Sequence, residues 1–345
     1  MNSNQSLKDP KATAKHLLSK YAIVIAFLVL FTAMAIARPE SFLRVGNLLN
    51  ILRQTAVIGV ITMGMTFVLL TGGIDLSVGS VIAISGVIVA YLAAPGGPSM
   101  AKTGFTHGAG VSDILAMDAT LPLIVPVLAG IGVGAFIGLI NGFVIAKGGV
   151  APFIVTMGMM TIIRGAALIV SDGGQLPYLT DNFKSIGKGS VFGIPYLAII
   201  MVVLALIVAF VLHRTCFGRH VYAIGGNEAS AHVSGIHVAR TKILVYVISG
   251  ACAGLAGLLL ASRTAVGSPQ SGNGYEMDAI ASCVIGGISL TGGVGTVFGS
   301  VLGVLFIAVM GNGMDMLGMN PYYQQITKGV IIILAVLYDM KSRKR

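Results

Sequence analysis

Long apolar runs alternate with short polar segments along nearly the whole chain. A helix of about 20 mostly apolar residues suffices to cross the roughly 30 Å hydrocarbon core of a membrane. The first run follows a basic leader and ends in Ala35-Ile36-Ala37, which is typical of a signal-peptide cleavage site. Because many further spans follow, we expect this run to be an uncleaved anchor. We predict about ten membrane-spanning segments in all, at residues 17–37, 54–71, 75–95, 121–146, 152–170, 194–212, 242–262, 276–290, 294–315 and 324–339.

Two polar, glycine-rich stretches interrupt this pattern. The first, GGIDLSVGS at 72–80, contains Asp75, and the second, GYEMDAIASCVIGGISLTGGVGT at 274–296, contains Ser289. Both contain the same sequence pattern: Gly-Gly-Ile, one variable residue, then Leu and a hydroxyl residue. Non-helical backbone is tolerated at membrane depth only where it is buried in protein or lines a cavity. We therefore predict broken helices or re-entrant turns at these two places.

Polar side chains also fall inside the predicted spans. Arg164 lies within 152–170 and Asn141 within 121–146. An ionisable group at membrane depth usually pairs with another or faces water, and Asp75 is a candidate partner for Arg164. We take Asp75, Asn141, Arg164 and Ser289 as candidate residues of a translocation pathway or its gate. A purely structural polar lock explains Asp75 and Arg164 equally well.

Glycines recur at every fourth position in two of the spans. Helices associate closely in lipid across faces of small residues, so these glycines predict a compact helical bundle. They are Gly130, Gly134, Gly138 and Gly142 in one span, and Gly295, Gly299 and Gly303 in another.

The segment YAIGGNEASAHVSGIHVART at 222–241 differs from an ordinary short connection between spans. Turn signals stand at Gly225-Gly226 and at Gly235, and they enclose a predicted short helix from Asn227 to Ser234. Asn227 is a suitable N-cap, and Glu228 falls in the first turn, where the helix dipole favours negative charge. The pattern favours a docking surface for a cytosolic partner, and a solvated connecting loop is the alternative.

The charge distribution predicts the orientation in the membrane. The chain has 22 Lys and Arg against 12 Asp and Glu, and both termini and the flanks of the 222–241 segment are basic. Because cytoplasmic segments carry the excess of Lys and Arg, we predict cytoplasmic termini and an even number of spans. The basic residues lie scattered at membrane edges, which suits anionic lipid and argues against nucleic-acid binding.

Composition and motifs exclude other classes of protein. Hydrophobic residues make up 55% of the chain and charged residues only 10%, against about 25% charged in soluble domains. The chain has no HExxH, GxSxG or GxxxxGK[ST] motif, so any ATP it uses must be hydrolysed by another chain. The three cysteines show neither metal-ligand spacing nor a disulfide framework, and we predict that they are buried by packing: Cys216, Cys252 and Cys283.

Five motifs in order resemble the sugar permeases of bacterial ABC importers, most closely the ribose type. The resemblance runs from about residue 45 to the C-terminus. The outer segment 96–120 is longer than the resemblance implies, and we assign it no role. The motifs are GGIDLSVGS at 72–80, APFIVTMGMMTIIRG at 151–165, YAIGGNEASAHVSGI at 222–236, GYEMDAIASCVIGG at 274–287 and YYQQITKG at 322–329.

The resemblance implies an all-α polytopic fold similar to the permease of the vitamin B12 importer, a type II ABC importer. It implies a cytoplasmic tail at 1–20, a transmembrane permease domain at 21–339 and a basic cytoplasmic tail at 340–345. Such a subunit moves a monosaccharide, ribose or a related sugar, across the bacterial inner membrane, commonly as a homodimer. This chain itself would hold no cofactor.

The implied partners are a cytosolic ATPase with two fused nucleotide-binding halves, which uses ATP and Mg, and a periplasmic sugar-binding protein. By the same resemblance, residues 222–236 form the coupling segment that docks in a groove on the ATPase. Its contact residues would be Asn227, Glu228, Ala229, Ser230, Ala231 and Gly235. Two alternatives stay open: an ATP-independent secondary transporter or channel for a small polar solute, and a membrane scaffold or receptor component.

Overall fold

The structure, a computed structural model, describes residues 22–94, 121–177 and 179–343. The predicted tail at 1–20 and the outer segment 96–120 lie outside these residues. Helix α16 continues to Arg343, into the predicted tail at 340–345. The elements are α2 (Ala22–Ala37), α3 (Pro39–Phe42), α4 (Val45–Leu70), α5 (Val78–Leu92), α7 (Ile124–Gly148), α8 (Pro152–Val170), α9 (Asp181–Lys188), β1 (Ser190–Val191), β2 (Ile194–Pro195), α10 (Tyr196–Arg214), α11 (Cys216–Gly226), α12 (Glu228–Val233), α13 (Val238–Thr264), α14 (Tyr275–Ile285), α15 (Val297–Met316) and α16 (Pro321–Arg343).

Six of the described helices are long and apolar enough to cross a membrane, namely α4, α7, α8, α10, α13 and α15. Shorter apolar helices lie at Ile23–Ala37 and Val78–Leu92. Each of the ten predicted spans overlaps one described helix. The helix in the predicted span 276–290 is short, because α14 ends at Ile285. Its 11 residues rise only about 16 Å, roughly half of the hydrocarbon core.

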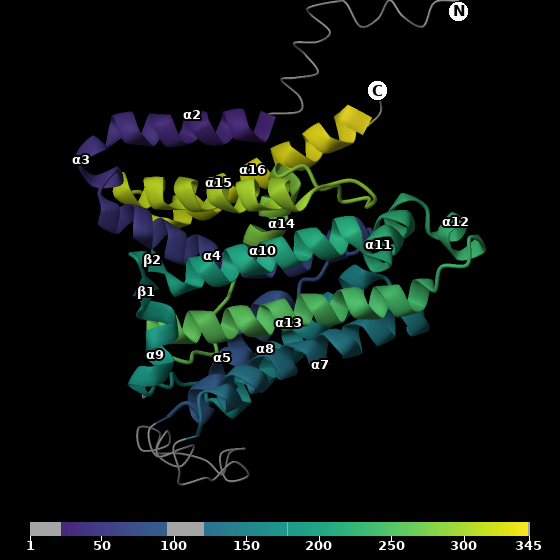
Figure 1. Ribbon diagram of the computed structural model, residues 1–345, viewed down its shortest axis with the longest axis horizontal. Coiled ribbons are helices and arrows are strands. Elements are labelled where there is room, and N and C mark those ends of the chain that lie inside the picture. The colour runs from purple at the N-terminus through teal and green to yellow at the C-terminus, as the bar shows by residue number, and fades with distance from the viewer. Residues whose placement is uncertain (1–21, 95–120, 178, 344–345) are drawn as a thin grey trace, which may run out of the picture.

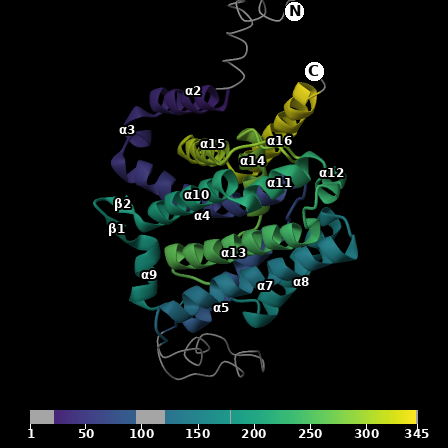
Figure 2. The same ribbon diagram turned by 45° about the vertical axis from the view of Figure 1, so that its right-hand side comes forward.

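The long helices run side by side, and the two ends of the bundle differ. Helix α12 and the end of α16 lie at one end, and α9 with the β1–β2 hairpin lies at the other (Figures 1 and 2). We call these the α12 end and the hairpin end. The antiparallel hairpin pairs Ser190 with Pro195 and Val191 with Ile194.

Helix α4 occupies the centre of the bundle. It packs against α10, α13, α14 and α15 and buries most of its apolar residues, among them Phe67 and Met63. Cys252 and Cys283 are buried, as predicted. Cys216 is exposed at the start of α11, so the prediction of burial is wrong there.

Small residues let helix backbones touch, as the glycine spacing predicted. Along α7, a Cβ at Gly138 would overlap the carbonyl oxygen of Tyr246, and one at Gly142 would lie 2.7 Å from the Cα of Ile243 on α13. On α15, Gly303 packs against the backbone of α14. Gly295 is different, because it precedes α15 in a turn with φ of +150°. It therefore does not belong to the helix face on which we had placed it.

The two glycine-rich stretches break the helical pattern, which confirms the prediction of broken helices. Residues 71–77 separate α4 from α5, and residues 286–296 separate α14 from α15. The two stretches also contact each other. The N–H of Gly293 donates to the carbonyl of Leu70 at 2.9 Å, and a Cβ at Gly72 would lie 3.3 Å from the carbonyl oxygen of Thr291.

Candidate functional site

The predicted short helix after α11 is present as α12. Asn227 has extended backbone angles, and its side-chain oxygen accepts a hydrogen bond from the N–H of Ser230 at 2.8 Å. This bond satisfies one of the free N–H groups of the first turn, as an N-cap does. Gly235 ends the unit in the left-handed conformation, with φ of +84°. The helix therefore stands as a defined element at one end of the bundle.

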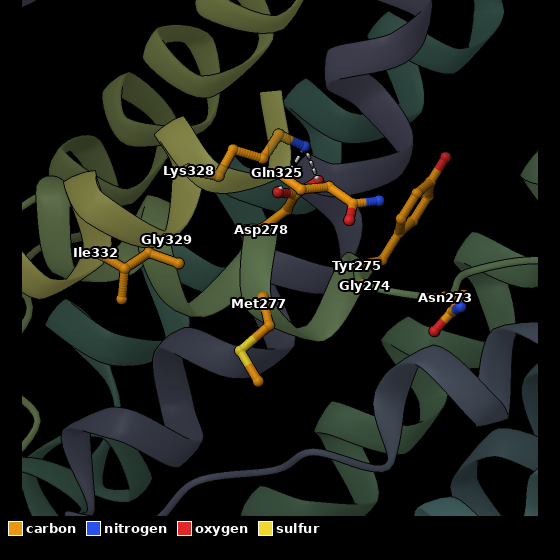
Figure 3. A pocket seen from close by; sticks show the side chains of 9 residues that line it. All are labelled: Asn273, Gly274, Tyr275, Met277, Asp278, Gln325, Lys328, Gly329 and Ile332. Atoms are coloured by element: carbon orange, nitrogen blue, oxygen red, sulfur yellow. Dashed lines mark hydrogen bonds and ion pairs between the residues drawn. The ribbon is translucent and has the colours of Figure 1, made fainter. Parts of the chain in front are cut away.

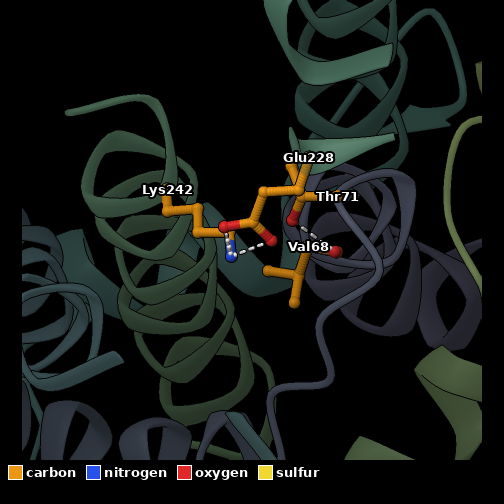
Figure 4. Close-up of polar contacts among 4 residues, drawn as sticks. All are labelled: Val68, Thr71, Glu228 and Lys242. Carbon is orange, nitrogen blue, oxygen red and sulfur yellow. Dashed lines mark hydrogen bonds and ion pairs between the residues drawn. The ribbon is translucent and has the colours of Figure 1, made fainter. Parts of the chain in front are cut away.

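The faces of α12 differ in what they contact. The ammonium group of Lys242 donates to both oxygens of Glu228 at 2.7 Å, which ties α12 to the start of α13 (Figure 4). Ala231 is 4% exposed and packs with Ile224 and Val238. Its side chain therefore faces its own chain and is not presented to a partner as we had expected. The exposed residues of the predicted contact set are Asn227, Glu228, Ala229, Ser230 and Gly235.

Sequence reasoning missed the most exposed apolar side chain of this helix. Val233, the last residue of α12, is 87% exposed. It comes two residues after Ala231, the last of the small helix residues that we had predicted to contact a partner. The signal in the sequence was a valine among polar residues. Its uncovered side chain is available for contact with a partner.

Helix α11 connects α12 to both broken stretches through a close backbone contact. A Cβ at Gly225 would overlap the carbonyl oxygen of Leu70 and the backbone N of Gly293. The hydroxyl of Tyr222, on the same helix, donates to the carbonyl of Gly295 at 2.9 Å. We call Leu70, Gly225, Gly292 and Gly293 the glycine junction. Helix α11 therefore joins α12 to both breaks.

Asp75 and Asn141 belong to one buried cluster. One Asp75 oxygen accepts from the N–H and the hydroxyl of Ser77, at 3.0 and 2.6 Å, and the other accepts from the hydroxyl of Ser249 at 2.8 Å. The amide of Asn141 donates to the Ser77 hydroxyl at 2.9 Å. Asp75 is 1% exposed. The cluster pins the break after α4 to α7 and α13, which is the arrangement expected of a polar lock.

Arg164 does not use Asp75 in the described structure. Its guanidinium donates to the carbonyls of Pro269 at 2.5 Å and Ser271 at 3.0 Å, both in the connection between α13 and α14. Two backbone oxygens take the place of the carboxylate that we considered from the sequence. Arg164 therefore holds an irregular segment of chain against α8.

Ser289 closes the turn at the second break. Its N–H donates to the carbonyl of Val294 at 3.0 Å, and its hydroxyl lies 3.0 Å from that of Thr291. The residue is fully buried. These contacts shape the 286–296 turn beside the glycine junction.

An ion pair on α14 and α16 was also missed. Lys328 lies 2.9 Å from both carboxylate oxygens of Asp278. Both residues stand inside quoted motifs, and Lys328 falls within a predicted span. An acidic and a basic residue in neighbouring spans are expected to pair at membrane depth, and this was the signal available.

Comparison with known proteins agrees with a transport subunit. Residues 47–336 match the family described as branched-chain amino acid transport system / permease component. The ribose import permease of Bacillus subtilis (strain 168) is 42% identical over 94% of each chain. That of Escherichia coli (strain K12) is 38% identical over 99% of this chain and all of its own.

An L-arabinose ABC transporter permease of Azospirillum brasilense is 36% identical over 95% of this chain and 90% of its own. No solved structure matches the chain. The family match at 47–336 includes most of the described helices, the two broken stretches and α12. The chain therefore belongs to this family of transport-system permease components and is a multi-pass membrane protein.

Proposed function

We propose that the chain is the permease subunit of an ATP-driven ABC importer that moves a monosaccharide, ribose or a related sugar, across the bacterial inner membrane. The observation that carries this proposal is the 42% identity with a ribose import permease over 94% of both chains. The family description refers to branched-chain amino acids. The individual relatives are named for ribose and L-arabinose, and this favours a sugar.

The proposed assembly contains a second copy of this chain, a cytosolic ATPase with two fused nucleotide-binding halves and a periplasmic sugar-binding protein. This chain supplies no nucleotide-binding motif and no cofactor, so ATP and Mg are used by the ATPase. Helix α8 supports a subunit contact, since it buries only Thr156 and Ala167 within its own chain. A motif-bearing helix with so little internal packing suits the contact between two copies.

Ten spans, cytoplasmic termini and a fold like that of the vitamin B12 importer's permease complete the proposal. The end of α16 lies on the same side of the bundle as α12, which supports a cytoplasmic C-terminus beside the ATPase-docking helix (Figure 2). The α12 end is then the cytoplasmic end, and the hairpin end is the outer one. In this proposal, the breaks after α4 and α14 are the places where movement changes the side to which the pathway opens.

Transport follows from these positions. The loaded binding protein docks on the outer end, and ATP binding closes the two halves of the ATPase. Closure displaces α12, and α11 carries the displacement to the glycine junction. The junction moves the two broken stretches together, and the pathway between the two permease copies changes the side to which it opens. All of the driving energy comes from the ATP of the partner.

Docking is tested by Val233→Asp, in a strain that lacks this permease. A charge at an exposed anchor should abolish sugar uptake and recovery of the ATPase with the permease, without touching the core. The matched control is Val45→Asp, because Val45 is 71% exposed at the start of α4, at the hairpin end. This control should keep normal recovery of the ATPase.

Two outcomes count against the proposal. If Val233→Asp loses the ATPase but keeps uptake, an ATP-independent transporter or channel explains the chain better. If neither variant changes uptake or ATPase recovery, α12 is not the docking helix. Substituting Ala231 is a poor probe, since its side chain is buried within the chain.

A further inference from the structure

Two adjoining cavities lie beside α14 and α16. The larger has a volume of about 450 Å³ and the smaller about 220 Å³. Both are lined in part by Tyr275, Asp278 and Lys328. Asn273, Gln325 and Met277 add to the lining of the larger cavity (Figure 3). The proposed transport mechanism uses none of these side chains.

The Asp278–Lys328 ion pair stands between the two cavities, well inside the membrane. Lys328 follows the first residue of α16, Pro321, by seven positions, which places it about 10 Å along the helix from the outer end. Asp278 is 7% exposed, and the Lys328 side chain is 30% exposed. Charges at this depth are costly and are kept mainly for function, facing a cavity or each other.

The backbone near the pair is also unusual for membrane depth. Helix α14 begins at Tyr275, after an irregular segment that Arg164 holds by two of its carbonyls. Gly272 and Gly274 in this segment have positive φ. Such a break within the membrane is tolerated where it is buried in protein or lines a cavity, and transporters place substrate sites at such breaks. The start of α14 meets this description.

The chemistry of the lining suits a neutral ligand rich in hydroxyl groups. The ion pair leaves spare acceptor positions on the carboxylate and a spare N–H on the ammonium group. The amides of Asn273 and Gln325 both donate and accept, and Tyr275 adds a ring face and a hydroxyl. Because the charges of Asp278 and Lys328 cancel, neither an anion nor a cation is favoured. A volume of 450 Å³ exceeds that of a monosaccharide and lies within the usual range for ligand pockets.

We propose that Asp278 and Lys328, with Asn273, Tyr275 and Gln325, form a monosaccharide-binding site on the permease itself. This proposal rests on the proposed function, since it assigns the substrate class of that function a place on this chain. The site makes the permease a second point of sugar selection after the binding protein. A sugar released at the outer end reaches the smaller cavity first and then the larger, passing the ion pair.

Cysteine protection in membranes that contain the full importer tests the site directly. The background is Cys216→Ser, which leaves only the buried Cys252 and Cys283. Gln325→Cys is then labelled with a membrane-impermeant thiosulfonate, with and without D-ribose. Labelling should slow about tenfold when the sugar is present at ten times its Kd. The control is Phe192→Cys, because Phe192 is 99% exposed in the hairpin and should show no protection.

Several outcomes overturn the site. They are an unreactive Gln325→Cys, labelling that D-ribose does not slow at any soluble concentration, and protection by L-leucine in place of the sugar. Failure of the wild type to import any sugar counts against the proposed function. Normal sugar import with an unprotected Gln325→Cys counts against the site alone.

Uptake by two variants gives an independent readout. Asp278→Asn keeps the shape of the side chain but removes the carboxylate, and Gln325→Leu changes an exposed side chain that the fold does not need. Asp278→Asn should lower the rate of sugar uptake about tenfold or more, the loss expected for a charge-assisted hydrogen bond, and Gln325→Leu should lower it severalfold, the loss expected for a neutral one. ATPase recovery should stay normal for both. Asp181→Asn, at an exposed position on α9, is the matched control. Wild-type uptake by Gln325→Leu would overturn the site, whether or not Asp278→Asn folds.

Discussion

The glycine junction offers the sharpest mechanical prediction, through the substitution Gly225→Ala. The added Cβ would lie 3.0 Å from the carbonyl carbon of Leu70 and would overlap its oxygen. Real Cβ atoms essentially never come within 3.0 Å of such an oxygen, so α11 must move by about 1 Å or more to clear it. Such overpacking costs about 1–3 kcal/mol. The intrinsic preference for alanine in a helix offsets at most about 1 kcal/mol of this.

The neighbouring glycine supplies the control. A Cβ at Gly226 would meet nothing within 4 Å, so Gly226→Ala changes helix propensity without overpacking. The difference between the two alanine variants therefore isolates the clash, at about 1–3 kcal/mol. We expect Gly225→Ala to melt several degrees lower than Gly226→Ala in detergent.

Sugar uptake should also be lower for Gly225→Ala than for Gly226→Ala. Because α12 stays exposed, Gly225→Ala should still bind the ATPase, but sugar uptake should fall since the two broken stretches no longer seat against α11. Uptake is measured in the complemented strain, with membrane insertion checked by blot. Equal melting temperatures and equal uptake for the two variants would refute the reasoning, since α11 would then not be in rigid contact with the breaks.

Further variants test the remaining contacts. Asn227→Ala removes the cap of α12 and should destabilise that helix by about 1 kcal/mol, seen as faster amide hydrogen exchange confined to α12. Gly138→Leu should prevent α7 and α13 from packing and abolish assembly, whereas Gly132→Leu, which meets no atom within 4 Å of the added Cβ, should insert and melt normally. Arg164→Met leaves two loop carbonyls unpaired at membrane depth, so we expect a loss of about 1–3 kcal/mol per buried group in a melting experiment. Asp75→Asn should lower the melting temperature while leaving sugar protection of the larger cavity unchanged, and altered protection would place Asp75 in the pathway.

Local chemistry explains which elements could be read in advance. The apolar runs predicted the positions of the long helices, because whether a segment enters lipid depends on the transfer free energy of its own side chains. The cap of α12 depends only on Asn227 and the turn that follows it. The glycine spacing on α7 predicted close packing against another helix, because rows of small residues in membrane helices let two backbones approach closely.

Other expectations failed because they depended on neighbours. The sequence could not show that Ala231 turns inward while Val233 projects, because the register of α12 depends on its packing against α11 and α13. Arg164 had an obvious acidic candidate in Asp75, yet in the structure it donates to two backbone carbonyls. The helix predicted over 276–290 ends earlier than expected, at Ile285.

By itself, the sequence determined the class of protein, the approximate helix positions and the short capped helix α12, since these rest on side-chain transfer energies and short-range caps. Only the tertiary structure decided which polar groups meet. It joined Asp75 to Asn141 through Ser77, placed Asp278 against Lys328, and brought the two glycine-rich stretches together. The physical reason is that a polar group buried at membrane depth must find a partner, but several partners satisfy it equally well. The choice among them is made by the packing of the whole bundle.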